Sequence, residues 1–182
     1  MTTIFIKTCP KDHQWLQYLL PSIEKYAEGF KDVVIVSDAG KRIIPPEYLN
    51  TIKKLPIKTH YIPVPIPDAR YPKFGHGGVG YLWQQYIKLS WHTLCDSDSA
   101  LILDSDEMLC KPTTPDDFKH DGKWVWTYRL WKDADSAQCW KSPTDTILQY
   151  NTPYEAMAHA GFVLTRNATT NLYYCVNYNL SM

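Results

Sequence analysis

The segment Ala100–Leu103 is a short, wholly apolar run that ends directly in Asp104-Ser105-Asp106. An apolar run of this length with acids only at its end is typical of a strand buried on both faces, as in a parallel sheet covered by helices. Sheets of this kind bind ligands at the carboxyl ends of their strands. The run therefore predicts an α/β fold in which both acids lie at the ligand-binding edge.

The amino-terminal part of the chain predicts a strand, a helix and a second strand. Thr3–Thr8 is the first strand, and Asp12 is the expected N-cap of a helix whose apolar residues recur at helical spacing. Pro21 lies within that helix and could kink or split it. Val33–Val36 is the second strand. This order indicates a parallel β-α-β unit.

The remaining segments continue the alternation of helices and strands. We expect helices over 46–52, 79–94, 144–150 and from 167 onward, and extended segments over 57–66, 124–128 and 161–165. The prolines of 57–66 confine that segment to a sheet edge. No internal repeat or linker separates these elements. The sequence therefore predicts one domain over 1–182, with a mostly parallel sheet flanked by helices.

Composition excludes several classes of protein. The 182 residues carry a formal net charge of zero, so no basic field favours nucleic acid or an anionic membrane as an obligatory partner. The five cysteines are scattered without metal-binding spacing, which indicates free thiols in a reducing compartment. The chain shows neither a secretory leader nor an apolar segment long enough to span a bilayer. We therefore expect a cytoplasmic protein without integral membrane association.

The spacing of Asp104 and Asp106 suits a divalent cation. Side chains two residues apart on a strand point the same way, roughly 7 Å apart, and carboxylate oxygens are ligands of hard divalent ions. The alternative is a strand that runs into an ordinary surface turn. Asp96-Ser97-Asp98 has the same letters but precedes the strand. We expect a solvated turn there, on the far side of the sheet from the ligand.

Two further motifs compete for the chemistry. Gly75 to Gly80 matches the G-x-G-x-x-G dinucleotide pattern, but it follows a proline-rich segment rather than the first strand, which favours a loop covering a ligand. The acids also resemble the first motif of haloacid-dehalogenase-type phosphatases, in which Asp104 would be the nucleophile and Asp106 a general acid. Met108 occupies a position where that family usually has Thr or Val, and earlier strands precede the motif.

The segment Gly80-Tyr81-Leu82-Trp83-Gln84-Gln85-Tyr86-Ile87-Lys88-Leu89, followed by Leu101-Ile102-Leu103-Asp104-Ser105-Asp106, resembles a known family. It is similar to the Q-Q-x-x-K-L helix and acidic strand of bacterial and viral glycosyltransferase-like proteins, and more broadly to GT-A-type nucleotide-sugar glycosyltransferases with a D-x-D motif. The resemblance implies a GT-A-like, Rossmann-like fold. It also implies transfer of a sugar from a nucleoside-diphosphate donor, a UDP-sugar above all, in a bacterial or host cytoplasm.

The resemblance further implies a metal site and its cofactor. Asp104 and Asp106 would hold Mn²⁺ or Mg²⁺, which would stabilise the departing nucleoside diphosphate. A late histidine often completes such a site, and His159 is the candidate.

Five more residues take donor-binding roles by the same resemblance. Thr8 and Asp38, at the ends of the first two strands, would face the nucleoside. Lys88 would approach the phosphates or the sugar. Gln84 and Gln85 would bond sugar hydroxyls, although one helix face cannot present both equally.

The carboxyl-terminal part is harder to interpret. An inverting enzyme needs a base, and Asp145 or Glu155 could serve. The resemblance divides the chain into a nucleotide-sugar half, 1–110, and the beginning of an acceptor half, 111–182. A truncated chain, a minimal enzyme and a site completed by a partner subunit remain open, as does a non-catalytic nucleotide-sugar-binding protein. The acceptor could be a carbohydrate, a protein or a modified nucleic acid.

Overall fold

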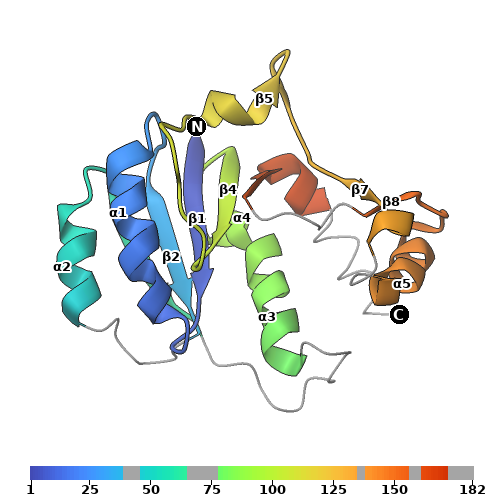
Figure 1. The fold of residues 1–182 in the computed structure, drawn as a ribbon, viewed down its shortest axis with the longest axis horizontal. Coiled ribbons are helices and arrows are strands. Elements are labelled where there is room, and N and C mark those ends of the chain that lie inside the picture. Colours follow the sequence, from blue (N-terminus) through green and yellow to red (C-terminus); the bar gives the residue numbers. More distant parts are fainter. Residues whose placement is uncertain (39–45, 65–77, 135–137, 156–160, 172–182) are drawn as a thin grey trace.

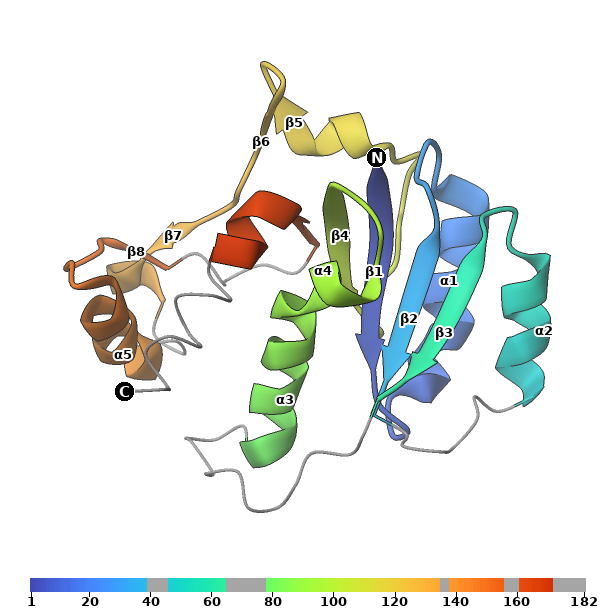
Figure 2. The same cartoon turned by 180° about the vertical axis from the view of Figure 1, so that it is seen from behind.

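Four parallel strands and one antiparallel strand form the central sheet (Figures 1 and 2). The computed structural model describes residues 1–38, 46–64, 78–134, 138–155 and 161–171. The strands of the sheet are β1 (Thr2–Thr8), β2 (Val33–Ser37), β3 (Thr59–Pro63), β4 (Ser99–Asp104) and β9 (Phe162–Thr165). They lie in the order β3-β2-β1-β4-β9, with β9 antiparallel to β4. The predicted α/β fold with a mostly parallel sheet is confirmed.

Helices and short strands make up the rest of the described chain. The α-helices are α1 (Leu16–Tyr26), α2 (Pro46–Lys54), α3 (Gly78–Leu89), α4 (Trp91–Leu94) and α5 (Gln138–Leu148). The 3-10 helices are η1 (His13–Trp15), η3 (Pro115–Phe118) and η4 (Trp131–Asp133). Two small antiparallel pairs join β5 (Lys119–His120) to β6 (Lys123–Trp124) and β7 (Arg129–Leu130) to β8 (Tyr154–Glu155).

The core lies on both faces of the sheet. One buried cluster includes Ile4, Ile6, Val33, Ile35, Leu101 and Leu103 from the strands and Leu16, Leu19, Leu20 and Ile23 from α1. The other includes Phe5, Val34, Val36, Ala100 and Ile102 from the strands, Ile87 from α3 and Trp91 from α4. Successive strand residues point to opposite faces. Because helices cover both faces, the central strands are apolar at consecutive positions, as the acidic strand is.

Most predicted elements appear close to their expected positions. β1 begins one residue earlier than expected, and β2 continues to Ser37. α1 is continuous through Pro21. α2 begins at Pro46, and the proline-bearing β3 is an edge strand. Residues 166–171 are helical after β9, close to the predicted start.

The expected strand over 124–128 is wrong. Lys123–Trp124 forms the strand β6, whereas residues 125–128 belong to no strand. Val125 and Tyr128 are exposed, at 48% and 58% of their surface. Aromatic and β-branched residues favour strands only where a neighbouring strand and a covering face are available.

The predicted long helix over 79–94 is two helices. α3 ends at Leu89 and α4 begins at Trp91, with Ser90 between them outside helical geometry (φ −88°, ψ 7°).

The side chain of Asp12, the expected N-cap, makes no capping bond; it accepts a bond from the Cys9 thiol at 2.9 Å. η1 instead begins the helical segment.

The second acidic triplet lies where the sequence predicts, before β4 at the amino end of the strand. Asp98 forms an ion pair with the amino group of Met1 at 2.5 Å, and both groups are exposed.

The described helices include none with the length and apolarity needed to cross a membrane.

Candidate functional site

The carboxyl ends of β1 and β4 border a crevice. The chain passes from β1 outward to β2 and β3, then returns to place β4 on the other side of β1. The two strands are paired in parallel register, with Lys7 opposite Asp104. Open α/β sheets bind ligands at such a point, because the connections after the two strands leave in opposite directions. The Asp104-Ser105-Asp106 segment therefore begins at the topological switch point.

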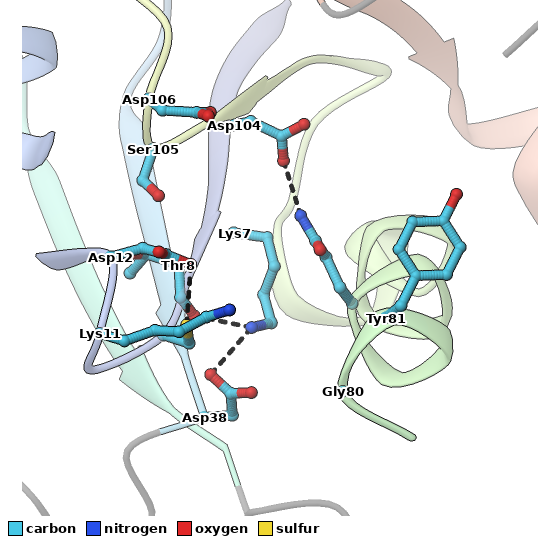
Figure 3. Close-up of a pocket in the computed structure, with 12 residues that line it drawn as sticks. Lys7, Thr8, Lys11, Asp12, Asp38, Gly80, Tyr81, Asp104, Ser105 and Asp106 are labelled. Atoms are coloured by element: carbon cyan, nitrogen blue, oxygen red, sulfur yellow. Dashed lines mark hydrogen bonds and ion pairs between the residues drawn. The ribbon is translucent and has the colours of Figure 1, made fainter. Parts of the chain in front are cut away.

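A pocket of about 390 Å³ occupies this crevice (Figure 3). It is lined by Lys7, Thr8, Cys9, Lys11, Asp12, Asp38, Gly80, Tyr81, Gln84, Asp104, Ser105 and Asp106. The lining comes from the ends of three parallel strands, from the residues that follow β1 and β4, and from the first two turns of α3. In Figure 3, Asp104 and Asp106 lie across the cavity from Asp38 and Lys11. The cavity thus brings together five residues that the sequence predicted to bind the donor or the metal: Thr8, Asp38, Gln84, Asp104 and Asp106.

Asp104 is fixed by two residues one turn apart on α3. Its Oδ1 accepts hydrogen bonds from Lys88 Nζ at 2.6 Å and from Gln84 Nε2 at 2.8 Å. Residues four apart lie on the same helix face, which explains why both reach one oxygen. The Lys88 side chain is 7% exposed and that of Asp104 is 30% exposed, so the ammonium group is buried while the carboxylate stays open to the pocket. Gln85, one position along the helix, is absent from the described lining of the pocket.

The turn after β4 presents Asp106 to solvent. The Asp104 backbone N–H donates to Glu107 Oε2 at 2.7 Å, and the Glu107 N–H donates to the Asp104 carbonyl at 3.2 Å. These bonds close a tight turn in which Ser105 is buried and Asp106 is exposed. Burial of the Glu107 carboxyl raises its pKa to about 7, although the backbone bond from Asp104 acts in the opposite direction.

Lys7 is a site residue that the sequence reasoning missed. Its Nζ donates to Asp38 Oδ1 at 3.0 Å and to the Thr8 carbonyl at 2.6 Å, and its side chain is 2% exposed. The available signal was a lysine within a strand that is otherwise apolar or threonine. A buried lysine needs a partner of opposite charge, and Asp38 at the end of the neighbouring strand supplies it.

Thr8 has a buried hydroxyl that lacks a partner within the described part of the chain. Its Oγ1 has no hydrogen bond to any described residue, although Thr8 is only 3% exposed and lines the pocket. Buried polar atoms are nearly always satisfied in folded proteins. Thr8 is one of several exceptions among the described residues, and it is the one that lines this cavity, where a ligand could complete the bond.

The acidic residues fit a divalent cation that also binds a ligand. Asp104 and Asp106 supply hard oxygen donors, and Asp106 is open to solvent. The part of the chain described contains no group of three or more His, Cys, Asp or Glu residues arranged for a metal. Mg²⁺ and similar ions are commonly held by one or two carboxylates, with substrate phosphates and water completing the shell. The donor set fits that kind of site rather than a cage made wholly of protein.

Other predicted residues lie away from the pocket or cannot be placed. Asp145 on α5 accepts from Lys141 Nζ at 2.5 Å and from the Thr152 N–H at 3.0 Å, and the bond from Lys141 lowers the Asp145 pKa. Glu155 pairs with Arg129 at 3.1 Å. Neither acid is among the described residues that line the pocket. His159 lies outside the described residues, as do residues 75–77 of the glycine motif.

Comparisons with known proteins find structures but no sequence families. No protein-family model matches the chain, and no curated protein matches it. Solved structures that resemble it include S. aureus TarS 1-349 (15% identity, TM-score 0.38), S. aureus TarS (18%, 0.35) and the apo-form glycosyltransferase GlyE of Streptococcus pneumoniae TIGR4 (11%, 0.37). The matches cover 59%, 58% and 58% of this chain, but only 28%, 16% and 23% of those chains.

Proposed function

We propose that the protein is a metal-dependent glycosyltransferase that takes a sugar from a nucleoside-diphosphate donor. The observation that carries this proposal is the pocket at the β1/β4 switch point, which combines Asp104 and Asp106 with the unpartnered hydroxyl of Thr8. A diphosphate needs a cation, and a nucleoside needs polar groups that lack internal partners. The pocket offers both kinds of group, and the acids and helix resemble those of D-x-D glycosyltransferases.

The donor would span the pocket between its two acidic sides. Thr8 and Asp38 would contact the nucleoside. Asp106, exposed at the end of the turn, is the group best placed to reach a cation without breaking an existing bond. Mn²⁺ or Mg²⁺, when bound, would supply positive charge to the leaving diphosphate.

Two buried lysines have separate tasks in this scheme: Lys88, which contacts Asp104 from behind the lining, and Lys7, which is part of the lining. Lys88 holds Asp104 in place and neutralises part of the negative charge of the two acids. Lys7 orients Asp38 and places a second buried ammonium group at the floor of the cavity. Gln84 keeps the Asp104 carboxylate oriented and can bond a sugar hydroxyl with its carbonyl oxygen.

The transfer step conserves atoms and charge. An acceptor hydroxyl oxygen bonds to the anomeric carbon of the donor sugar, and the bond from that carbon to the diphosphate oxygen breaks. The electron pair of the broken bond leaves with the nucleoside diphosphate, and the hydroxyl proton passes to a base or to water. A UDP-sugar is the proposed donor. Asp145 stays a predicted base. In the structure its carboxylate already accepts a hydrogen bond from Lys141, which would have to be released for it to take the proton.

The test is release of nucleoside diphosphate from a panel of nucleotide sugars in the presence of Mn²⁺. We expect release with at least one donor, loss of release with a chelator, and a decrease of roughly 100-fold or more in Asp106→Asn. Asp121→Asn is the matched control, because Asp121 is an exposed acid at the β5–β6 turn. If no donor binds or turns over, the proposal is wrong.

Two other outcomes would favour the alternatives. A phosphatase would form a phosphoaspartyl adduct at Asp104, trapped with beryllofluoride, and would release phosphate from non-nucleotide esters. The acids, however, lie on the fourth strand in chain order rather than on the first. A non-catalytic nucleotide-sugar-binding protein would bind the donor by calorimetry and transfer nothing to any acceptor.

A further inference from the structure

A second, smaller groove adjoins the donor pocket on the side of α1. It has a volume of about 260 Å³ and is lined by Trp15, Tyr18, Asp106, Glu107 and Met108. Asp106 lines both cavities, so the groove and the donor pocket meet at this carboxylate. A ligand in the groove would therefore lie beside the proposed reaction centre.

The walls of the groove are large side chains that are exposed together. Trp15, Tyr18 and Met108 expose 42%, 51% and 53% of their surfaces. The Trp15 and Tyr18 rings have centroids 6.2 Å apart and planes tilted by 40°, so they form an open angle rather than a closed stack. Exposed apolar residues are common singly, but a group of three around one concavity indicates a binding surface.

Buried hydrogen bonds hold both sides of the groove. On the aromatic side, His13, two residues before Trp15, has its Nε2 bonded to Ser37 Oγ at 2.9 Å in the interior. On the acidic side, the Leu109 N–H donates to Ser22 Oγ of α1 at 3.0 Å. The turn that carries Asp106 is thus tied to the helix that carries Tyr18. Such a surface loses little conformational entropy when a ligand binds.

The chemistry of the groove selects a neutral ligand with many hydroxyl groups. Ionised carboxylates only accept hydrogen bonds, and sugar hydroxyls donate them. The described lining contains no lysine or arginine, so a phosphate or other anion would meet Asp106 without a compensating charge. Aromatic rings offer a flat apolar face, which matches the C–H face of a pyranose. The volume is below the roughly 300–1,000 Å³ of drug-sized pockets, which suits one ring.

We propose that this groove binds a pyranose ring of the acceptor, which makes the acceptor a carbohydrate. The assignment rests on the proposed function, since it uses Asp106 as the boundary between donor and acceptor. Trp15 and Tyr18 hold the ring, and the carboxylate of Asp106 orients its hydroxyls toward the donor pocket.

The first experiment measures binding of single sugars without any donor. Methyl pyranosides of glucose, galactose, mannose and N-acetylglucosamine are the probes, observed by saturation-transfer NMR with the full chain. We expect saturation of the ring C–H protons of at least one probe, with affinity reduced about five- to tenfold in Trp15→Ala and in Tyr18→Ala. Tyr150→Ala is the matched control, because Tyr150 is also exposed, at 64%, and follows α5.

Trp15→Phe supplies a second readout that does not require the fold to tolerate alanine at position 15. It keeps an aromatic ring and removes one indole N–H resonance, which identifies the Trp15 signal in the parent spectrum. That signal should shift on titration with the bound pyranoside. If no probe is saturated, or if the affinity is unchanged in both Trp15→Ala and Tyr18→Ala, the groove is not an acceptor site.

Donor hydrolysis separates this inference from the proposed function. If the parent chain hydrolyses a donor but no pyranoside binds at Trp15, the groove assignment fails and the transferase proposal survives. If a pyranoside binds but no donor is hydrolysed, the sugar site survives and the transferase proposal fails.

Discussion

Two buried lysines define the electrostatics of the pocket at the residue scale. Lys7 and Lys88 are almost fully shielded from solvent, and each is neutralised by one carboxylate, Asp38 and Asp104 respectively. An isolated buried charge is costly, whereas a hydrogen-bonded pair is tolerated. The pairs therefore fix both carboxylates in place before any ligand arrives. Of the site's acids, Asp106 keeps the exposure that a cation needs.

Lys7 provides the first prediction. Lys7→Met leaves the largely buried Asp38 carboxylate without its partner, and we expect a loss of about 3 kcal/mol in the free energy of unfolding. In the double variant Lys7→Met/Asp38→Asn the charge is removed as well, so at least half of that loss should be recovered. Urea unfolding of the four proteins of this cycle measures the coupling. Simple additivity of the two single losses would contradict the assigned pair.

Cys95 and Cys110 provide a second residue-scale prediction. Burial raises the pKa of the Cys95 thiol to about 12, with the Asp32 carboxylate adding to the effect. The thiolate is the reactive form, so at about pH 8 Cys95 should react with a disulfide reagent on the order of 1,000-fold more slowly than an ordinary exposed thiol. Peptide mapping after timed labelling should show modification at the exposed Cys110 long before Cys95.

The raised pKa of Cys95 also predicts the direction in which stability changes with pH. Above about pH 8.5 an unfolded cysteine loses its proton while folded Cys95 keeps it. The folded state then binds more protons, so stability falls as the pH rises. Cys95→Ala should lessen that fall, as measured by thermal unfolding between about pH 8 and pH 10. An identical slope in both proteins would contradict the raised pKa.

At the residue scale, the sequence correctly predicted that Asp104 and Asp106 lie at the end of a buried strand, whereas their role in metal binding stays a prediction. Asp104 and Asp106 follow an uninterrupted apolar run, and a run of that kind has to end at a sheet edge. Lys7 could not be recognised in this way, because its partner Asp38 is 31 residues away. The sequence shows a charge in a strand, and only the pairing of β1 with β2 shows what neutralises it.

At the element scale, one arginine joins the last strand to the middle of the chain. Arg166, directly after β9, donates through Nε to the Ser97 carbonyl at 2.9 Å, through Nη1 to the His92 carbonyl at 2.8 Å and through Nη2 to the Cys95 carbonyl at 2.6 Å. Its guanidinium also lies 5.6 Å from the Trp91 ring centroid. These contacts fix the loop that leads into β4, and so they help set the register of the acidic strand.

This contact gives a prediction at the element scale. Arg166→Met leaves three carbonyls without their shared donor, and we expect a loss of about 2–4 kcal/mol in the free energy of unfolding. Arg166→Lys should recover less than half of that loss, because an ammonium group lacks the planar fork that reaches three acceptors. Denaturant unfolding measures both, with the exposed Lys132→Met as control. Full rescue by lysine would show that charge alone matters.

Element types were easier to predict than element ends and partners. The apolar spacing over 79–94 is helical throughout, but Ser90 breaks the helix so that Trp91 can enter the core and donate to Thr169 at 2.9 Å. Residues 125–128 have strand-forming side chains without a strand to pair with. In both cases tertiary contacts far along the chain decided the outcome, and local pattern does not contain them.

At the scale of the whole molecule, the sequence predicted the mostly parallel sheet but not its strand order. The β-α-β pattern favours parallel neighbours, and three such pairs occur in the sheet. The antiparallel direction of β9 is set by its pairing with β4 across the segment from 105 to 161, which carries no pattern that reveals direction. The switch point follows from strand order, so the site's exact lining needed the structure.

The last prediction concerns the coupling of the donor site to global stability. A ligand that binds only the folded chain stabilises it by about 2.7 kcal/mol at 100 times its dissociation constant. For a domain of this size that corresponds to a rise of about 5–10 °C in the unfolding temperature. We expect this rise with UDP and Mn²⁺ together, a smaller one with UDP and a chelator, and only that smaller rise in Asp106→Asn with either addition. Asp121→Asn should behave as the parent chain does, because that acid lies on the β5–β6 turn. Equal stabilisation with and without Mn²⁺ would mean that the pocket holds the nucleotide through Thr8, Asp38 and the lysines alone, and the metal-dependent part of the proposal would then fail.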